Sequence, residues 1–380
     1  MRINADWIND PDLQQLLRLL DQAGHRALLV GGCVRNALLL VPIDDIDIAT
    51  DAHPERVIVL AEAAGLRVVP TGFDHGTVTV VSGSKSYEVT TFRRDIATDG
   101  RRATVAFATD IAEDAARRDF TMNALYADYQ GKVIDPLGGL PDLRARHVRF
   151  VGDPHARIRE DFLRILRFFR FHAWYGDPMF GLDPEGLAAC AELSGGIETL
   201  SRERLGHEMR KLLAAPDPAP SLAAMQASGV LAQVLAGADS RAVAPLVHLE
   251  DGMPPSHLRR LAALGGADPA KALRLSRNDA RQLGILRDAI GTPAAAAELA
   301  YRHGAETAAA IVLLRAALLE HPLPEGWKRD IARGSLAKFP LRAADLADRF
   351  SGPALGEKLR ESEARWIASG FQLSREQLIT

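Results

Sequence analysis

Cysteine is scarce in this sequence. Its 380 residues include two cysteines, Cys33 and Cys190, which lie far apart in the chain. Two isolated thiols supply neither the spacing of a disulfide framework nor the clustered ligands of a zinc site. The eleven histidines form no metal-ligand cluster either. We therefore expect both cysteines to be small buried hydrophobic residues.

Long apolar runs and a strong net charge are also lacking. The sequence has no N-terminal signal pattern, and no apolar run approaches the roughly 18 residues of a membrane-spanning helix. We therefore expect a cytoplasmic protein without a membrane partner. The formal net charge of −3 excludes a globally basic nucleic-acid-binding protein. Any surface for RNA must then be a local arginine patch.

The sequence pattern changes near residue 145, in a chain long enough for two or more domains. Before that point, helical and strand periodicities alternate, which predicts a head with a mixed, partly antiparallel sheet. The predicted helices are 11–24, 34–40 and 54–65, and the predicted strands are 27–30, 45–49, 77–81 and 87–92. Beyond residue 145 the pattern is helical throughout, so we predict an α+β fold with an all-helical second part.

The run 28–50, LLVGGCVRNALLLVPIDDIDIAT, begins with a turn suited to phosphate. Gly31 and Gly32 let backbone amides approach a polyanion that a side chain would keep away. Arg35 adds a forked cation that matches phosphate geometry. A glycine pair alone is usually a simple turn, so the interpretation depends on the residues after it.

Carboxylates come after this turn on a predicted strand. Asp45 and Asp47 are two residues apart, which would place them on one face of a strand, where they can share divalent metal ions. Alone, such a pair is usually a solvated turn or strand edge. Combined with the glycine turn, it indicates metal-assisted nucleotidyl transfer. Glu88, on a later predicted strand, is a candidate third carboxylate or base, although a strand glutamate is usually simply exposed.

Segment 159–171, REDFLRILRFFRF, has apolar residues at helical spacing, which predicts one amphipathic helix. Asp161 and Arg164 are three residues apart on it, so their charged ends can lie side by side. Such a pair can accept from the exocyclic amine of cytosine or adenine and donate to the adjacent ring nitrogen. Uracil and guanine would present mismatched groups. The alternative is a helix surface with an ordinary ion pair.

In order and spacing, these segments resemble the motifs of the tRNA nucleotidyltransferase/poly(A) polymerase family, within the polymerase-β-like superfamily. The run 28–50 resembles GGxVRDxLLGxxxxDIDxAT, RRDFTMNAL at 117–125 resembles RRDFTxNAL, and segment 159–171 resembles EDxxRxxRxxRF. Weaker likenesses lie at 134–143 and 200–213. Three residues depart from the first motif: Asn36 stands for Asp, Leu40 for Gly, and Asp44 for a residue that is often basic.

The resemblance, closest to bacterial class II tRNA nucleotidyltransferases, implies a polymerase-β-like head followed by helical parts. The head would span 1–145. The helical parts would be a neck for nucleobase selection at 146–215, a body at 216–300 and a tRNA-binding tail at 301–380. It implies that Asp45 and Asp47 hold two Mg²⁺. The implied nucleotide-binding residues are Gly32, Arg35, Arg118, Asp119, Asp161, Arg164, Arg167 and Arg170. Of these, Arg118 and Asp119 would contact triphosphate and ribose, whereas Glu203 and Arg204 would brace the neck.

The implied reaction is template-independent addition of C, C and A to the 3′ end of tRNA from CTP and ATP, with DNA not expected as a partner. Segment 91–107 resembles the flexible loop that allows the change from CTP to ATP, with Asp99-Gly100-Arg101-Arg102 kept and Ala103 in place of proline. The alternatives are a bacterial poly(A) polymerase, or a partial enzyme that adds only CC or only A. A more remote alternative is a catalytically inactive RNA-binding module.

Overall fold

The computed structural model describes residues 1–99 and 102–379. The chain divides into two compact units, Met1–Ala236 and Gly237–Thr380. The first contains all the strands of the described residues and the second is helical, which confirms the α+β prediction. In the described part of the chain, no helix combines the length and apolar character needed to cross a membrane. The finer division into head, neck, body and tail stays a prediction.

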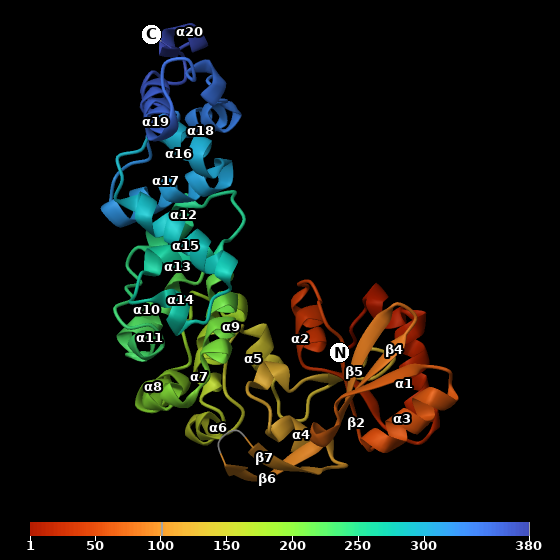
Figure 1. Ribbon diagram of the computed structural model, residues 1–380. Helices are drawn as coiled ribbons and strands as arrows, with labels where there is room; N and C mark the ends of the chain where they lie inside the picture. The colour runs from red at the N-terminus through yellow and green to blue at the C-terminus, as the bar shows by residue number, and fades with distance from the viewer. Residues whose placement is uncertain (100–101, 380) are drawn as a thin grey trace. The chain divides into compact units, whose positions relative to one another are not determined.

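A seven-stranded mixed sheet organises the first unit, in the order β3-β4-β5-β2-β1-β8-β9 (Figure 1). The parallel pair is β2 with β5, and the other neighbours are antiparallel. The strands are β1 (Ala27–Val30), β2 (Asp47–Thr50), β3 (Arg67–Gly72), β4 (Thr77–Ser82), β5 (Lys85–Thr91), β8 (Tyr126–Ala127) and β9 (Val133–Ile134). The strands predicted at 77–81 and 87–92 are confirmed as β4 and β5, and they form a hairpin with Gly83 in its turn at φ 58°.

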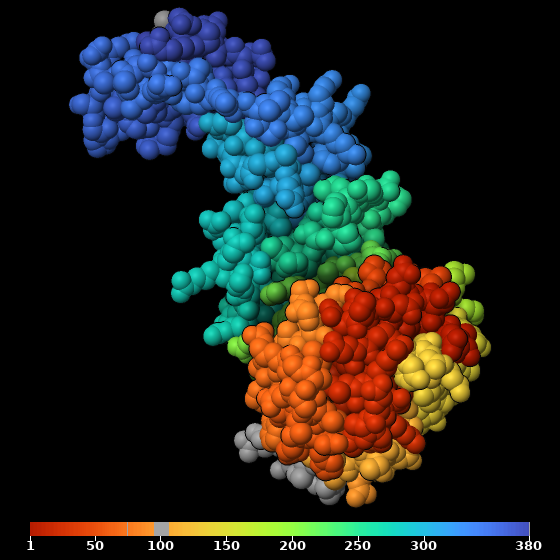
Figure 2. All heavy atoms as spheres, turned by 90° about the vertical axis from the view of Figure 1, so that its right-hand side faces the viewer, coloured from red at the N-terminus to blue at the C-terminus, as the bar shows by residue number. Residues whose placement is uncertain are grey.

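Helices α1 (Pro11–Gln22) and α3 (Pro54–Ala63) pack on this sheet. The Asp10 side chain caps α1 by accepting from the Asp12 and Leu13 amides at 3.0 and 3.3 Å. Leucines at i, i+3, i+4 and i+7 spacing then give the helix one fully buried face; they are Leu13, Leu16, Leu17 and Leu20. At the edge of the sheet, the N-terminal segment lies beside residues 131–133. Figure 2 shows the N-terminal part of the chain, in red, packed against a segment coloured yellow.

Strand β2 begins at Asp47, so the predicted strand 45–49 is wrong at its start. Its antiparallel partner β1 ends at Val30, which pairs with Asp47. Gly31, at φ 69°, then turns the chain into α2 (Gly32–Leu39). No β1 residue remains to pair with residues 45 and 46, and Asp45 therefore lies in the preceding loop, exposed.

The charged segment 91–107, which resembles the family's flexible loop, contains a two-stranded hairpin. Strand β6 (Arg93–Asp99) pairs with β7 (Arg102–Phe107), from Arg93 opposite Phe107 to Asp99 opposite Arg102. Gly100 and Arg101, part of the predicted nucleotide-switching loop, lie outside the described residues. Extended segments that are consecutive in the chain can satisfy their backbone groups in such a hairpin. The role of this segment in nucleotide switching stays a prediction.

The pattern of segment 117–125 allows a helix start, but the helix before it, α4 (Ile111–Ala116), has already ended. A short 3₁₀ turn, η3 (Thr121–Asn123), and irregular backbone come next. Phe120, Met122 and Leu125 are nevertheless completely buried, as their apolar character predicts. The Thr121 and Val151 amides tie this segment by hydrogen bonds to the stretch 149–151. Tertiary pairing therefore decides its conformation.

Helices make up the rest of the first unit. The break between α6 (Pro154–Glu160) and α7 (Leu163–Tyr175) has the largest effect on the predicted site. The predicted helix 159–171 is in fact two helices, interrupted at Asp161, whose φ and ψ of −156° and 106° are extended. Its carboxylate accepts from the Leu163 amide at 3.1 Å, a local bond that competes with helix continuation. The helices are α5 (Leu140–Arg144), α6 (Pro154–Glu160), α7 (Leu163–Tyr175), α8 (Pro184–Glu192), α9 (Arg202–Leu213), α10 (Ala219–Ala227) and α11 (Val230–Val234).

The second unit is built around α17 (Ala305–Leu319), which is buried over most of its surface. Its Arg315 donates to the carbonyl of Ala289, at the end of α15 (Arg277–Ile290), at 2.8 Å, and to that of Ala294, in the segment after α15, at 2.7 Å. Glu250 accepts from both Arg259 and Arg260 in the interior. The other helices are α12 (Val243–Leu249), α13 (His257–Leu264), α14 (Pro269–Ala272), α15 (Arg277–Ile290), α16 (Ala296–His303), α18 (Trp327–Leu336), α19 (Gly352–Ala368) and α20 (Arg375–Ile379).

Both cysteines are free and buried, as predicted. Burial raises the pKa of the Cys33 thiol to about 11, so it is protonated at neutral pH. Neither thiol is therefore a candidate nucleophile.

Candidate active site

A cleft of about 580 Å³ lies in the first unit, where the start of α2, the start of β2, the segment after α4, and α7 and α9 meet. Its lining residues are Gly31, Gly32, Arg35, Asp47, Arg117, Arg118, Asp119, Asn123, Asp161, Leu163, Arg164, Arg167, Phe171, Arg204 and Lys211.

The charge of this lining is opposite in sign to that of the chain. Seven arginine or lysine side chains face three aspartates in the cleft, whereas the chain has a net charge of −3. Cations gathered in a concave site focus their potential and attract anions. The expected local arginine patch is therefore present, and it fits a polyanionic ligand such as a nucleoside triphosphate or RNA.

The glycine turn forms one wall of the cleft. A Cβ on Gly31 would lie 3.3 Å from Arg118 Nη1, in addition to the strain of φ 69°. Only glycine therefore fits this position without strain, and α2 begins directly after it. The free amides of the first helical turn are suited to oxygen atoms of phosphate.

Arg35 is held rigidly behind this turn. Its guanidinium donates to Asn123, to Asn36 Oδ1 from Nε at 3.1 Å and from Nη2 at 2.8 Å, and to the Tyr175 hydroxyl at 2.8 Å. It also lies over the Tyr175 ring, 4.0 Å from the centroid. The side chain is buried, with 6% of its surface exposed. Its charge therefore sits at a fixed place in the cleft wall.

The predicted metal ligands lie near one another without forming a closed site. Asp47 and Glu88 occupy opposite positions on the parallel strands β2 and β5. Burial, and then the negative charges of Glu88 and Asp45, raise the pKa of Asp47 against the lowering effect of Arg118. Asp47 lines the cleft, whereas Asp45 and Glu88 are exposed residues outside its lining.

The donor set fits a hard divalent cation. Among the described residues, no three His, Cys, Asp or Glu side chains are grouped closely enough to hold a metal by themselves. Mg²⁺, however, is usually held by one or two carboxylates together with substrate phosphates and water. A cation beside Asp47 would also offset the repulsion that raises the pKa of this carboxyl.

Arg118 and Asp119 are fixed by separate networks. Arg118 donates to Asp114 at 3.0 Å and to the Tyr126 hydroxyl at 3.0 Å. Burial alone would lower the pKa of Arg118, but Tyr126 and Asp114 outweigh burial and raise it. Its charge is therefore permanent. The sequence analysis did not identify Asp114 and Tyr126 as site residues, although the spacing of four residues between Asp114 and Arg118 is typical of a helical ion pair.

Asp119 accepts four hydrogen bonds. Its donors are the Phe120 amide at 2.8 Å, Asn123 Nδ2 at 2.9 Å, and Nε and Nη2 of Arg167, with Nε at 2.8 Å. Burial would raise the pKa of Asp119, but Arg167 and these hydrogen bonds outweigh burial and lower it to about 2. Asp119 is thus ionised at neutral pH, with Arg167 as its counterion.

Asp161 and Arg164 line the same cleft, and the Arg164 amide donates to the Asp161 carbonyl at 3.0 Å, but their side chains bond to other residues. Asp161 Oδ2 accepts from Arg204 Nη2 at 2.7 Å. Arg164 pairs with Glu160 and donates to the Arg117 carbonyl at 3.1 Å. The break at Asp161 separates the pair that a continuous helix would have joined. Arg204, predicted to act as a brace, does so by bonding Asp161 and also faces the cleft.

The structure brings most of the predicted residues together. Gly32, Arg35, Asp47, Arg118, Asp119, Asp161, Arg164 and Arg167 line the cleft. Arg170 does not, because it is buried against α9, where Glu208 accepts from its Nε. Sequence reasoning missed Arg117, Asn123, Phe171 and Lys211, whose cleft positions depend on packing between distant segments.

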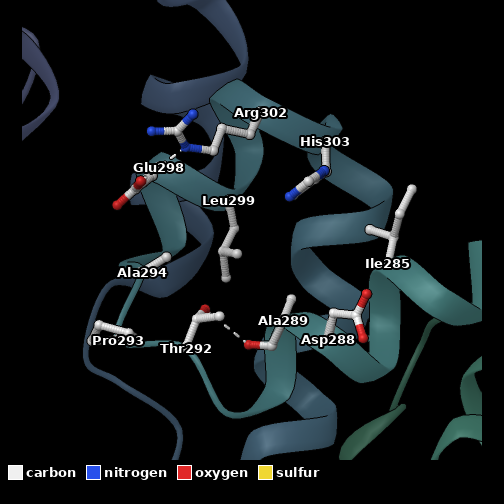
Figure 3. Close-up of a pocket in the computed structure, with 10 residues that line it drawn as sticks. All are labelled: Ile285, Asp288, Ala289, Thr292, Pro293, Ala294, Glu298, Leu299, Arg302 and His303. Carbon is white, nitrogen blue, oxygen red and sulfur yellow. Dashed lines mark hydrogen bonds and ion pairs between the residues drawn. The ribbon is translucent and has the colours of Figure 1, made fainter. Parts of the chain in front are cut away.

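A pocket of about 480 Å³ in the second unit has a different character (Figure 3). It lies between α15 and α16, with Leu299 and Ile285 among its lining and His303 at one side. Its arginine, Arg302, is paired with Glu298 at 2.9 Å. This lining lacks the excess of cations found in the cleft of the first unit, so we assign the candidate active site to that cleft.

Family models match two segments of the chain. The model described as "Poly A polymerase head domain" matches residues 27–149. A second, described as "Probable RNA and SrmB- binding site of polymerase A", matches residues 179–241. Together they include the glycine turn, both aspartates of the first motif and α9.

Curated relatives carry related names. The mouse mitochondrial CCA tRNA nucleotidyltransferase 1 is 30% identical over 391 residues, 97% of this chain and 89% of that one. Its human counterpart is 41% identical over 53% of this chain and 46% of that one. A CCA-adding enzyme from Streptococcus gordonii is 42% identical over 58% of this chain and 55% of that one. In the last two matches, the chain spans about half the length of the relative.

Solved structures share the fold. The CCA-adding enzyme of Bacillus stearothermophilus, in complex with CTP, is 30% identical with a TM-score of 0.72 over 94% of this chain and 92% of that one. A Thermotoga maritima CCA-adding enzyme, complexed with tRNA, has a TM-score of 0.73 at 20% identity, over 99% of this chain and 95% of that one. The latter likeness is one of fold.

Proposed function

Because the chain belongs to the tRNA nucleotidyltransferase/poly(A) polymerase family, we propose that it adds C, C and A to the 3′ end of tRNA. The reaction would consume CTP and ATP, release pyrophosphate, and need no nucleic-acid template. The observation that carries this proposal is the shared cleft, in which phosphate-binding features and the candidate base-selecting pair line one cavity. The name of the mouse relative and the CTP bound by the Bacillus enzyme support the choice of substrates.

The family relies on a divalent metal ion for this chemistry, and here we propose two Mg²⁺ at Asp45 and Asp47. When bound, such ions lower the pKa of the attacking 3′-hydroxyl and neutralise charge on the triphosphate. Asp47 lines the cleft and is the first residue of β2, where Val30 and Glu88 pair with it on the neighbouring strands. Asp45 precedes it on the loop, so its carboxylate would complete the pair once metal and triphosphate are present. Glu88, opposite Asp47, would add negative charge beside them.

The remaining residues orient the nucleotide. The amides after Gly31 and the fixed charges of Arg35 and Arg118 would hold the triphosphate. Asp119 would approach the ribose hydroxyls, with Arg167 keeping its carboxylate ionised and fixed in direction. Positioning of this kind is the main contribution that a protein makes to phosphoryl and nucleotidyl transfer.

Asp161 and Arg164 would select the base. In the structure, each already has a protein partner, Arg204 and Glu160 respectively. Cytosine and adenine both offer an amine donor beside a ring-nitrogen acceptor, so either base can replace part of these contacts. Uracil and guanine would leave charged groups facing the wrong partner, which buried polar sites penalise strongly.

A tRNA transcript that lacks its 3′ CCA tests the proposal. It is incubated with the protein and Mg²⁺ in CTP alone, ATP alone, or both, and the products are resolved at single-nucleotide length. We expect growth by two nucleotides with CTP and a stop at three with both. Unlimited growth with ATP would instead identify a poly(A) polymerase, a stop after CC with both would identify a partial enzyme, and no growth would favour an RNA-binding role.

A further inference from the structure

Trp174 extends the cleft-facing side of α7. Arg167 and Phe171 line the cleft and lie four residues apart. Trp174 comes three residues after Phe171, so the three side chains occupy i, i+4 and i+7 positions of one helix face. The tryptophan therefore lies one turn beyond the cleft lining, on the same side of the helix.

The indole ring is held in place and exposed. Its Nε1–H donates to the Lys211 carbonyl at 2.8 Å, which ties α7 to the last turn of α9. The residue still exposes 41% of its surface. Lys211 itself is exposed and lines the cleft. A fixed aromatic surface thus lies beside a cation at the end of a positively charged cleft.

We propose that Trp174 and Lys211 form a platform for the single-stranded 3′ end of the acceptor RNA, an inference that rests on the proposed function. A base of this end stacks on the indole, and Lys211 pairs with a flanking phosphate. Single-stranded RNA is commonly bound in this way, by aromatic stacking within a groove of positive charge. The excess of cations in the adjoining cleft is complementary to an RNA backbone.

Distance separates this platform from the site of the incoming nucleotide. Trp174 is ten residues after Arg164 on the same helix, which corresponds to about 15 Å along its axis. A base held by Asp161 and Arg164 therefore cannot also stack on Trp174. The ring is positioned for a different base, and the acceptor strand supplies one.

Steady-state kinetics on the intact protein distinguish these roles. Trp174→Leu removes the aromatic face but keeps an apolar side chain, and it should raise KM for CCA-less tRNA by about fivefold to a hundredfold. The KM for CTP and the kcat should stay within about twofold. Trp174→Phe keeps a stacking ring and should restore most of the RNA affinity. Phe180→Leu, at an exposed aromatic outside the cleft lining, is the matched control and should leave both constants unchanged.

Tryptophan fluorescence provides a test without catalysis. Binding of CCA-less tRNA should quench tryptophan emission in the wild type, and the part of this quenching that comes from Trp174 should be absent in Trp174→Phe. A tRNA trimmed to a blunt acceptor end should not cause the quenching that comes from Trp174. Unchanged RNA KM in Trp174→Leu, an equal rise in KM for CTP, or the same effect in Phe180→Leu would each overturn the platform. If the wild type binds tRNA with this quench but adds no nucleotide, the proposed function fails and the platform stands.

Discussion

Arg167 donates a hydrogen bond of 2.8 Å from Nε to Asp119, a residue 48 positions earlier in the chain. The two side chains join α7 to the segment after α4, across the wall of the cleft. This contact therefore couples the part of the first unit that carries the sheet to the helices that come after it. Burial would raise the pKa of Asp119, but Arg167 and the hydrogen bonds to this carboxylate outweigh burial and lower the pKa to about 2.

This depressed pKa predicts a pH-dependent contribution to stability. An aspartate with an unfolded pKa near 3.9 stabilises the fold above that pH, and the contribution is lost as pH falls towards 2. We expect Asp119→Asn to cost about 2–3 kcal/mol in unfolding free energy at pH 7. Urea titrations of both proteins from pH 7 to pH 2 measure this difference, which should shrink below pH 4. A difference independent of pH would show that the Asp119–Arg167 ion pair is not its source.

Asp47→Ala should reduce nucleotidyl transfer by at least about a thousandfold, because it removes the cleft's candidate metal ligand. Affinity for tRNA, measured by filter binding, should stay within about twofold. Asp44→Ala changes an exposed aspartate three residues away and should retain activity. Equal loss of RNA binding and transfer in Asp47→Ala would contradict the metal role.

Arg164→Ala should relax base choice by at least about tenfold, since one of the two groups that read the base is then missing. The measurement is the ratio of kcat/KM for CTP to that for UTP on CCA-less tRNA. Arg159→Ala, at an exposed position of α6, serves as the control. Continued exclusion of UTP and GTP in Arg164→Ala would refute base selection by this residue.

Leu40→Gly should stabilise the protein by about 0.5–1 kcal/mol. Leu40 ends α2 in the left-handed conformation at φ 57°, and 93% of its surface is exposed, so the side chain gains little from its surroundings. Thermal unfolding measures the change. Leu39→Gly, at the last residue of the helix, should instead destabilise by up to about 1 kcal/mol; equal effects of the two substitutions would exclude relief of backbone strain.

Asn36→Asp should loosen the loop that leads to Asp45. The Asn36 amide accepts from Arg35 through Oδ1 and donates to the Pro42 carbonyl through Nδ2 at 2.6 Å. A carboxylate would keep the first contact but would repel the carbonyl. Hydrogen exchange of residues 40–46 should therefore become faster, and kcat should fall more than affinity for CTP. Unchanged exchange would show that the Pro42 contact does not hold the loop.

Local sequence patterns determined the α+β class, the core face of α1 and the β4–β5 hairpin. A glycine turn and closely spaced charges also identified Gly32, Arg35, Asp47, Asp161 and Arg164 as site residues. The family resemblance added Arg118, Asp119 and Arg167. The buried state of Cys33 and Cys190 followed from their isolation in the sequence. These features depend on residues that are close in sequence, whose geometry the backbone constrains directly.

The tertiary structure alone decided which charges meet. Asp161 and Arg164 have the spacing of a helical pair, yet Arg204 bonds the first and Glu160 the second. Arg170 matched the nucleotide-binding pattern but is buried beside Glu208. Strand β2 begins at Asp47 because β1 ends at Val30. Where many arginines and carboxylates compete, partner choice depends on distances between segments tens of residues apart, and short-range spacing does not specify those distances.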